Sequence, residues 1–89
     1  MTEIRFTKSA RKHRVGRTRA KQVIEHPYAL LRQPRFDQPD MLMFLGDDET
    51  GRALEVGAVE VSEDLLLVIH VMDLRQKFRE PYEQGKREE

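Results

Sequence analysis

The sequence contains no cysteine, and its five glycines are scattered along 89 residues. The missing cysteines exclude disulfides, iron–sulfur clusters and cysteine-rich zinc sites, and a small domain without such links is typical of an intracellular protein. The glycines form neither a P-loop nor a dinucleotide-binding fingerprint, and no local serine–histidine pattern supports covalent hydrolysis. We therefore expect a cytoplasmic protein that uses no cofactor.

Long apolar segments are also missing. The main apolar run, residues 65–72, is far too short to cross a bilayer, and the stretch MTEIRFTKSARKHR lacks the apolar core of a signal peptide. His13, His26 and His70 have no metal-ligand spacing. We expect a soluble single domain over residues 1–89 without a metal site or a membrane partner, and with a short disordered tail from about residue 84.

Charge is balanced in total but divided along the chain. The whole sequence has 16 basic and 16 acidic residues; residues 1–35 hold ten basic and two acidic ones, whereas residues 36–89 hold six and fourteen. Such asymmetry indicates a surface for nucleic acid or for an acidic partner. The alternative is that the two halves fold together and neutralise each other through surface ion pairs, each of which contributes little.

The spacing of apolar residues predicts two N-terminal helices. Thr7 or Ser9 would cap the first helix, and the second would begin at about Arg17 and end before Pro27. One continuous helix through Gly16 is the alternative. The apolar face of the first helix would carry Phe6, Ala10 and His13.

Strand patterns follow in the rest of the chain. They are YALL, MLMFLG, RALEVGAVEV and LLLVIHVM, with DDETG as a hairpin connection. Pro34 and Pro39 predict a loop, since proline cannot donate to a central strand. LLLVIHVM is apolar on both faces, which is typical of a central or well-covered strand. Asp73 would cap a final helix that Pro81 shortens or kinks.

These elements predict an α+β domain. It would have two N-terminal helices, a three- to four-stranded mainly antiparallel sheet and a C-terminal helix. The helices would cover one face of the sheet, and the other face would be open to a partner.

Three stretches, in order over residues 6–83, carry a resemblance to a known family. KHRVGRTRA has Lys-His, then Val15 and Ala20; LGDDETGRALEV has a Gly-Arg pair that begins an aliphatic strand; and VIHVMDLRQKFREPYE joins a last strand to a basic helix ending in Tyr-Glu. Together they resemble the BrnT-type toxins of type II toxin–antitoxin pairs, a branch of the RelE-like ribonucleases. The chain departs from that family at Met72, where a basic residue is usual, and at Phe78, where an acidic one is usual.

The resemblance implies a RelE-like fold and a toxin that cuts messenger RNA without a metal ion and so inhibits translation. It also implies a cognate antitoxin, a small DNA-binding protein. Attack of a ribose 2′-hydroxyl on the neighbouring phosphate needs a proton acceptor, cations near the phosphate and an acid for the leaving 5′ oxygen.

Residue chemistry then selects the candidate site. Histidine titrates near neutrality, and the fork of arginine fits phosphate oxygens. We predict His70 as general acid or base, Arg75 and Lys77 as phosphate-binding cations, and Tyr82 as a positioning or proton-donating hydroxyl. The predicted RNA-binding residues are Lys8, Arg11, Lys12, Arg14 and Arg52.

Each candidate residue also has a structural interpretation. His70 would be a hydrogen-bonded core residue, Tyr82 a packing residue on its helix stripe, and Arg75 with Lys77 a solvated helix face. His13 with Lys12 would fix the corner between the first two helices. At the level of the whole protein, the alternatives are a non-catalytic module whose basic helices bind nucleic acid or protein, and a homo-oligomer that pairs the basic part of one copy with the acidic part of another.

Overall fold

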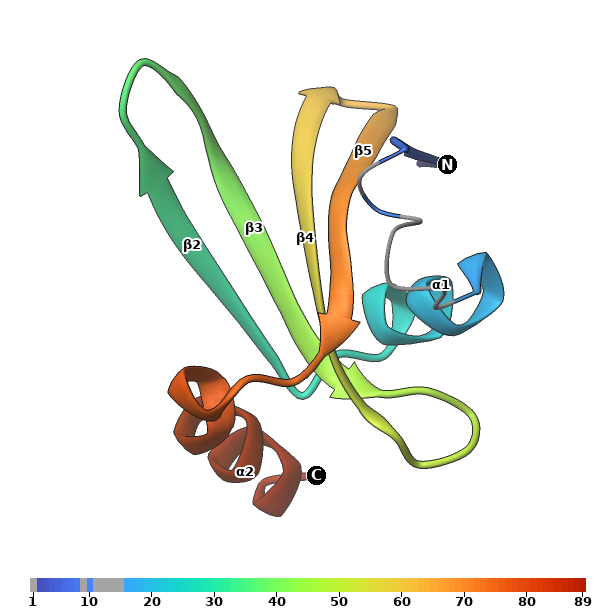
Figure 1. Cartoon of the computed structure of the whole chain (residues 1–89), viewed down its shortest axis with the longest axis vertical. Helices are drawn as coiled ribbons and strands as arrows, with labels where there is room; N and C mark the ends of the chain where they lie inside the picture. The colour runs from blue at the N-terminus through green and yellow to red at the C-terminus, as the bar shows by residue number, and fades with distance from the viewer. Residues whose placement is uncertain (1, 9, 11–15) are drawn as a thin grey trace.

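The structure, a computed structural model, describes residues 2–8, 10 and 16–89 (Figure 1). It is of the α+β class. Its elements, in chain order, are β1 (Glu3–Phe6), α1 (Arg17–Glu25), β2 (Ala29–Arg35), β3 (Gln38–Asp47), β4 (Ala53–Ser62), β5 (Leu65–Asp73), the 3-10 turn η2 (Gln76–Phe78) and α2 (Arg79–Arg87). No helix among the described residues is long and apolar enough to cross a membrane.

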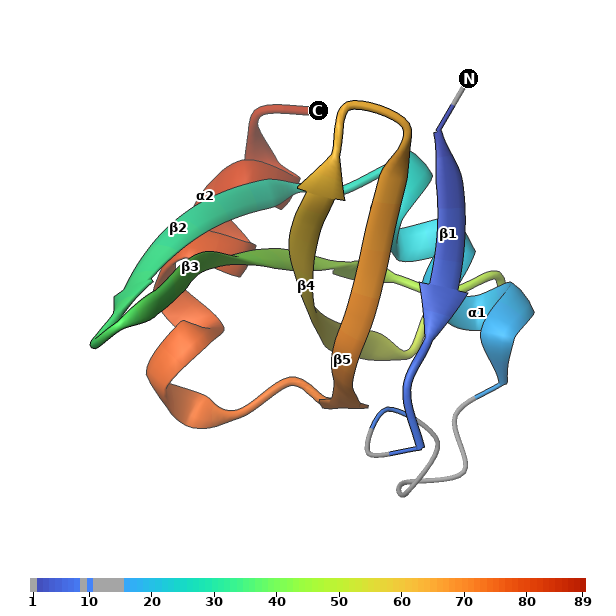
Figure 2. The ribbon, with the colours of Figure 1, turned by 90° about the horizontal axis from the view of Figure 1, so that it is seen from above.

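Five strands form one mixed sheet in the order β1-β5-β4-β3-β2. Figure 2 shows this order from β2 at one edge to β1 at the other. β1 runs parallel to β5, and the other neighbours are antiparallel. The prediction of three to four mainly antiparallel strands after two N-terminal helices is therefore wrong. β4, and not the doubly apolar β5, is the central strand.

β1 replaces the start of the first predicted helix. Ile4 and Phe6 alternate with exposed Glu3 and Arg5, a period of two that fits a strand covered on one face. Phe6 therefore packs against the core from a strand. After β1, the Thr7 hydroxyl accepts a hydrogen bond from the Ala10 N–H at 3.3 Å, while Ser9 and residues 11–15, including His13, lie outside the described residues. The second predicted helix is confirmed as α1, which stops before Pro27.

β2 and β3 extend through the segment that the prolines predicted to be a loop. Pro34 lies on the edge strand β2 at a register shift between Gln33 and Arg35, and it has no partner in the ladder. Pro39 lies in the part of β3 that reaches beyond its pairing with β4. The loop prediction is wrong because neither proline occupies a position where its backbone would have to donate a hydrogen bond to a central strand.

Helices cover both faces of the sheet. Successive residues of a strand point to opposite faces, and β3 shows the consequence. Leu42 and Phe44 belong to the cluster that contains Ala20 and Val23 of α1, whereas Met43 and Leu45 pack with Phe78 and Tyr82 of η2 and α2. α1 and α2 accordingly lie on either side in Figure 1. The expectation that all helices share one face is wrong.

The C-terminal segment differs from the prediction in its cap. Asp73 ends β5 instead of capping a helix, and the N-cap of α2 is Phe78, the last residue of the turn η2. Pro81 occupies the first turn of α2, where its missing N–H has no intrahelical partner to lose. Residues 84–87, expected to belong to a tail, form the end of α2.

A glycine allows α2 to lie on β2. A Cβ at Gly85 would stand 2.1 Å from the Tyr28 carbonyl oxygen, a distance that no real Cβ tolerates. The same approach brings the rings of Tyr28 and Tyr82 edge to face, with centroids 5.7 Å apart. α2 is thereby held at the end of the sheet where β2 begins and β3 ends.

Candidate functional site

A buried carboxylate lies at the centre of the candidate site. Glu55 of β4 has no exposed surface, although its neighbours on the strand, Leu54 and Val56, are core residues that point the other way. Its ladder partners are Leu45 on β3 and Met72 on β5, so it projects toward the face that carries η2 and α2. A carboxylate at such a place requires hydrogen bonds and a counter-charge.

Arg75 supplies the counter-charge and most of the hydrogen bonds to Glu55. Its Nε donates to Glu55 Oε2 at 3.0 Å, its Nη2 donates to the same oxygen at 2.7 Å, and its backbone N–H donates to Oε1 at 2.8 Å. This fork-to-carboxylate geometry is the strong form of an ion pair. The Arg75 side chain is still 41% exposed, and no described residue binds its Nη1. Arg75 therefore has N–H donors that can reach a ligand.

His70 is the third member of the cluster. Its Nε2 lies 2.9 Å from Glu55 Oε2, and its side chain is 25% exposed. An ionised carboxylate can only accept, so Nε2 carries the hydrogen and, in a neutral ring, Nδ1 holds the free lone pair. No described residue binds Nδ1. Gly57, the ladder partner of His70, provides room, because a Cβ there would stand 3.2 Å from that of His70 and 2.8 Å from Met41 Sδ.

Burial and hydrogen bonding act on Glu55 in opposite directions. Burial raises the pKa of the carboxyl, but the hydrogen bonds from Arg75 and His70 outweigh it and bring the net pKa below its ordinary value. The hydrogen bonds to Glu55 raise the pKa of Arg75. The cluster therefore holds a fixed negative charge against a fixed positive one, with the imidazole bonded to the negative member.

A second polar cluster lies beside the first. The Tyr82 hydroxyl donates to Asp47 Oδ1 at 2.5 Å, and Lys86 Nζ donates to Asp47 Oδ2 at 2.9 Å. Burial is the main cause that raises the pKa of Tyr82, and the hydrogen bond to Asp47 is the second. Asp47 pairs with Ala53 on β4, two residues along the ladder from the Leu45–Glu55 pair, so Asp47 and Glu55 are diagonal neighbours on the same face of the sheet.

The raised pKa of Tyr82 predicts a loss of stability in alkali. An unfolded tyrosine ionises at about pH 10, so the stability contributed by the protonated hydroxyl is full below that pH and is lost as the pH rises through the higher folded value. We expect the free energy of unfolding in urea to fall above about pH 10. Tyr82→Phe should start about 1 kcal/mol lower, because Asp47 loses a donor, and should decline less steeply with pH.

Tyr28→Phe is the matched control for this measurement. The Tyr28 hydroxyl donates to the same carboxylate over a long distance, 3.4 Å, so this hydrogen bond is weak. Removing the Tyr28 hydroxyl should therefore keep the alkaline decline of the parent. Equal slopes for the parent and Tyr82→Phe would contradict the assignment.

The structure brings together some of the predicted catalytic residues. His70 and Arg75 share Glu55, and the cations of Arg75 and Lys77 lie 5.5 and 5.1 Å from the centroid of the Phe78 ring. Phe78 is 4% exposed, so both cations lie against a buried aromatic ring. Tyr82 is buried in the Asp47 cluster, as its packing interpretation predicts.

The predicted RNA-binding residues divide into three groups. Lys8 is exposed beyond the end of β1. The Arg52 guanidinium pairs with Asp73 across β4 and β5. The other three, Arg11, Lys12 and Arg14, lie outside the described residues.

Glu55 was missed by reasoning from the sequence. Within RALEVGAVEV the alternation around Leu54 and Val56 predicts a half-exposed strand, in which a glutamate belongs on the wet side. The signal that could have found it is Gly57, two residues later on the same face, because glycine in a strand marks a close approach by another group.

Comparison with known proteins gives no assignment. No family model matches the chain, and no curated protein matches it significantly. Within the described residues no group of three histidine, aspartate or glutamate side chains is placed to hold a metal ion. The site thus consists of a histidine, His70, and an arginine, Arg75, held side by side on one buried carboxylate, Glu55.

Proposed function

We propose that this chain is a metal-independent endoribonuclease, the toxin of a type II toxin–antitoxin pair, that acts on messenger RNA in the cytoplasm. The observation that supports the proposal is the Glu55–His70–Arg75 cluster: a partly exposed imidazole, oriented through Nε2, beside a partly exposed guanidinium. A proton-transferring group next to a phosphate-binding cation is what cleavage through a ribose 2′-hydroxyl needs.

In this proposal Nδ1 of His70 takes the proton of the 2′-hydroxyl. The 2′ oxygen then forms a bond to the neighbouring phosphorus, and the bond from phosphorus to the 5′ oxygen breaks. The leaving 5′ oxygen takes a proton from a water molecule, and the imidazolium of His70 gives its proton to the hydroxide that results. The products are a 2′,3′-cyclic phosphate and a 5′-hydroxyl. Glu55 is a positioning residue, because it holds the ring and stabilises the imidazolium that forms.

Arg75 stabilises the charge that builds on the phosphate. Two of its three guanidinium nitrogens bind Glu55, so Nη1 is available for the phosphate oxygens. Lys77, on the other side of the contact with Phe78, adds a second cation. Arg75 would then take the part of the basic residue that is missing at Met72, which faces Glu55 across the β4–β5 ladder.

The experiment is cleavage of messenger RNA by the purified protein in EDTA, with and without ribosomes. We expect fragments that end in a 2′,3′-cyclic phosphate and a 5′-hydroxyl, identified by mass spectrometry. Intact RNA under both conditions would remove the enzyme proposal. A short open reading frame for a small DNA-binding protein next to the gene would support the proposed antitoxin.

A second candidate is a non-catalytic nucleic-acid-binding module. The observation that favours it is Met72, which stands where the resemblance implies a cation, while the bidentate Glu55–Arg75 contact also suits a purely structural role. This candidate predicts RNA binding that weakens steeply with salt and RNA that is intact afterwards, so the same incubation separates the two.

A further inference from the structure

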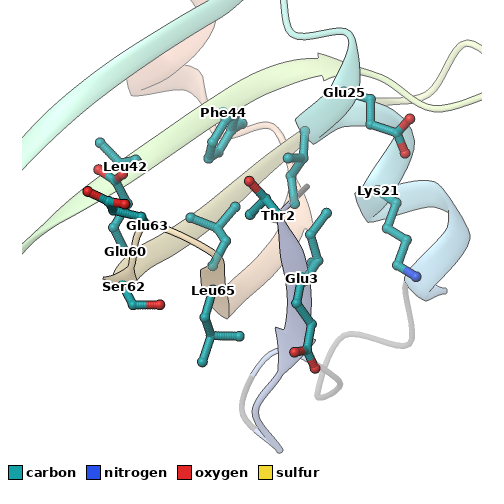
Figure 3. A pocket seen from close by; sticks show the side chains of 13 residues that line it. Thr2, Glu3, Lys21, Glu25, Leu42, Phe44, Glu60, Ser62, Glu63 and Leu65 are labelled. Atoms are coloured by element: carbon teal, nitrogen blue, oxygen red, sulfur yellow. The ribbon is translucent and has the colours of Figure 1, made fainter.

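An open hollow lies on the opposite face of the sheet from the Glu55 cluster. Its volume is about 720 Å³, and it lies between α1 and the turn that joins β4 to β5 (Figure 3). Its floor is apolar and is formed by Ile4, Ile24, Leu42, Phe44, Leu65 and Leu66. α1 has nine residues and covers only part of this face, so the floor is open toward the turn.

The rim of the hollow is acidic. Four glutamates line it against a single lysine, Lys21. Glu3 forms an ion pair with Arg5, but Glu25, Glu60 and Glu63 form none with any described residue. In Figure 3 Glu60 and Glu63 lie at the turn and Glu25 on α1, so the charges stand on both sides of the apolar floor. Among the described residues, the rim of the hollow therefore carries an excess of negative charge around an apolar surface.

We infer that this hollow docks a basic amphipathic helix of a partner protein. The apolar face of such a helix, with residues at i, i+3, i+4 and i+7, fits an apolar floor, and lysines or arginines along its flanks meet the glutamates. Charge complementarity at a rim speeds association and excludes partners of the wrong sign. The inference does not depend on ribonuclease activity, because it concerns the other face of the sheet.

The charge of the rim argues against other occupants. RNA and anionic membranes would be repelled by the four glutamates. Three arginines of the basic N-terminal part, Arg5, Arg17 and Arg19, are engaged within the chain by Glu3, by the Phe6 ring and by Asp48 with Glu49, so they are not free to meet the glutamates of a second copy.

The test uses a fluorescein-labelled helical peptide of leucine and lysine, with leucine at i, i+3, i+4 and i+7, and fluorescence anisotropy as the readout. We expect the parent protein to bind the peptide. The double variant Glu60→Lys/Glu63→Lys should bind it at least about tenfold more weakly. The matched control is Glu80→Lys/Glu88→Lys, which makes the same change of charge at exposed glutamates in the C-terminal segment 79–89 and should bind like the parent. Urea unfolding verifies that both double variants fold.

Two further peptides separate the contributions to binding. A peptide with serine in place of leucine keeps the charge and loses the apolar face, and one with glutamate in place of lysine keeps the face and reverses the charge; both should bind at least about tenfold more weakly. Equal binding by the serine peptide, or unchanged binding by Glu60→Lys/Glu63→Lys, would overturn the inference. Self-association of the parent in sedimentation, abolished by the same double variant, would assign the hollow to a second copy and also overturn it.

Discussion

The His70→Ala protein is expected to cleave RNA about 100- to 10,000-fold more slowly than the parent, the usual contribution of a positioned proton-transfer group. The ring is held by Glu55 through Nε2, so that Nδ1 stays available to the 2′-hydroxyl. Removing the ring removes the proton acceptor but leaves the Glu55–Arg75 ion pair in place. The measurement is single-turnover cleavage of a short labelled RNA, with RNA affinity determined separately by anisotropy.

A structural role for His70 would give a different result. It predicts a lower free energy of unfolding and a rate that returns to the parent value once the fraction of folded protein is taken into account. The pH profile is the second readout: the parent rate should depend on pH through the imidazole, and the His70→Ala rate should lose that dependence. A decrease of less than about threefold, with an unchanged pH profile, would remove His70 from the reaction.

Glu55→Gln tests the positioning role of the carboxylate. The amide keeps the shape of the side chain and loses the charge that stabilises an imidazolium. We expect a smaller loss of rate than for His70→Ala and a displaced pH profile. This distinguishes orientation of the ring from contact with the substrate.

Local patterns predicted the parts of the fold that depend on neighbours in the sequence. The α1 helix was found because Ala20 and Val23 share a helical face and Pro27 ends it. The hairpin between β3 and β4 was found from DDETG, where Asp48 accepts hydrogen bonds from the backbone of Thr50 and Arg52 and Gly51 has a positive φ of 87°. These signals are contained within a few residues.

Long-range pairing explains what the sequence did not reveal. β1 pairs with β5, so that Glu3 stands opposite Leu65, and no local periodicity marks that partner. The tolerance of Pro34 in a strand depends on β2 being at the edge of the sheet, which is a property of the whole sheet. Glu55 likewise obtains its partners from residues 15 and 20 positions away.

The Arg75→Ala protein is expected to unfold with a free energy about 2–3 kcal/mol below that of the parent near neutral pH. Removing one partner of a buried ion pair leaves an uncompensated charge, which costs about 3–5 kcal/mol when both partners are fully enclosed. Arg75 is 41% exposed, so water can replace part of the guanidinium, and the expected loss is smaller. Glu55 would retain the N–H of residue 75 and His70. Urea unfolding provides the measurement.

The dependence of this loss on pH identifies Glu55 as its origin. In the parent, the lowered pKa of Glu55 contributes stability that is full above the unfolded value and is lost as the pH falls through the folded value. Without Arg75, burial dominates and raises the pKa of the carboxyl, so acid should protonate Glu55 and stabilise the variant. The difference between the two proteins should therefore shrink as the pH falls from about 7 to about 4. The control is Arg87→Ala, on the exposed end of α2, whose free energy of unfolding should stay within about 0.5 kcal/mol of that of the parent. A difference between the parent and Arg75→Ala that does not depend on pH would instead attribute the loss to the contact between Arg75 and Phe78.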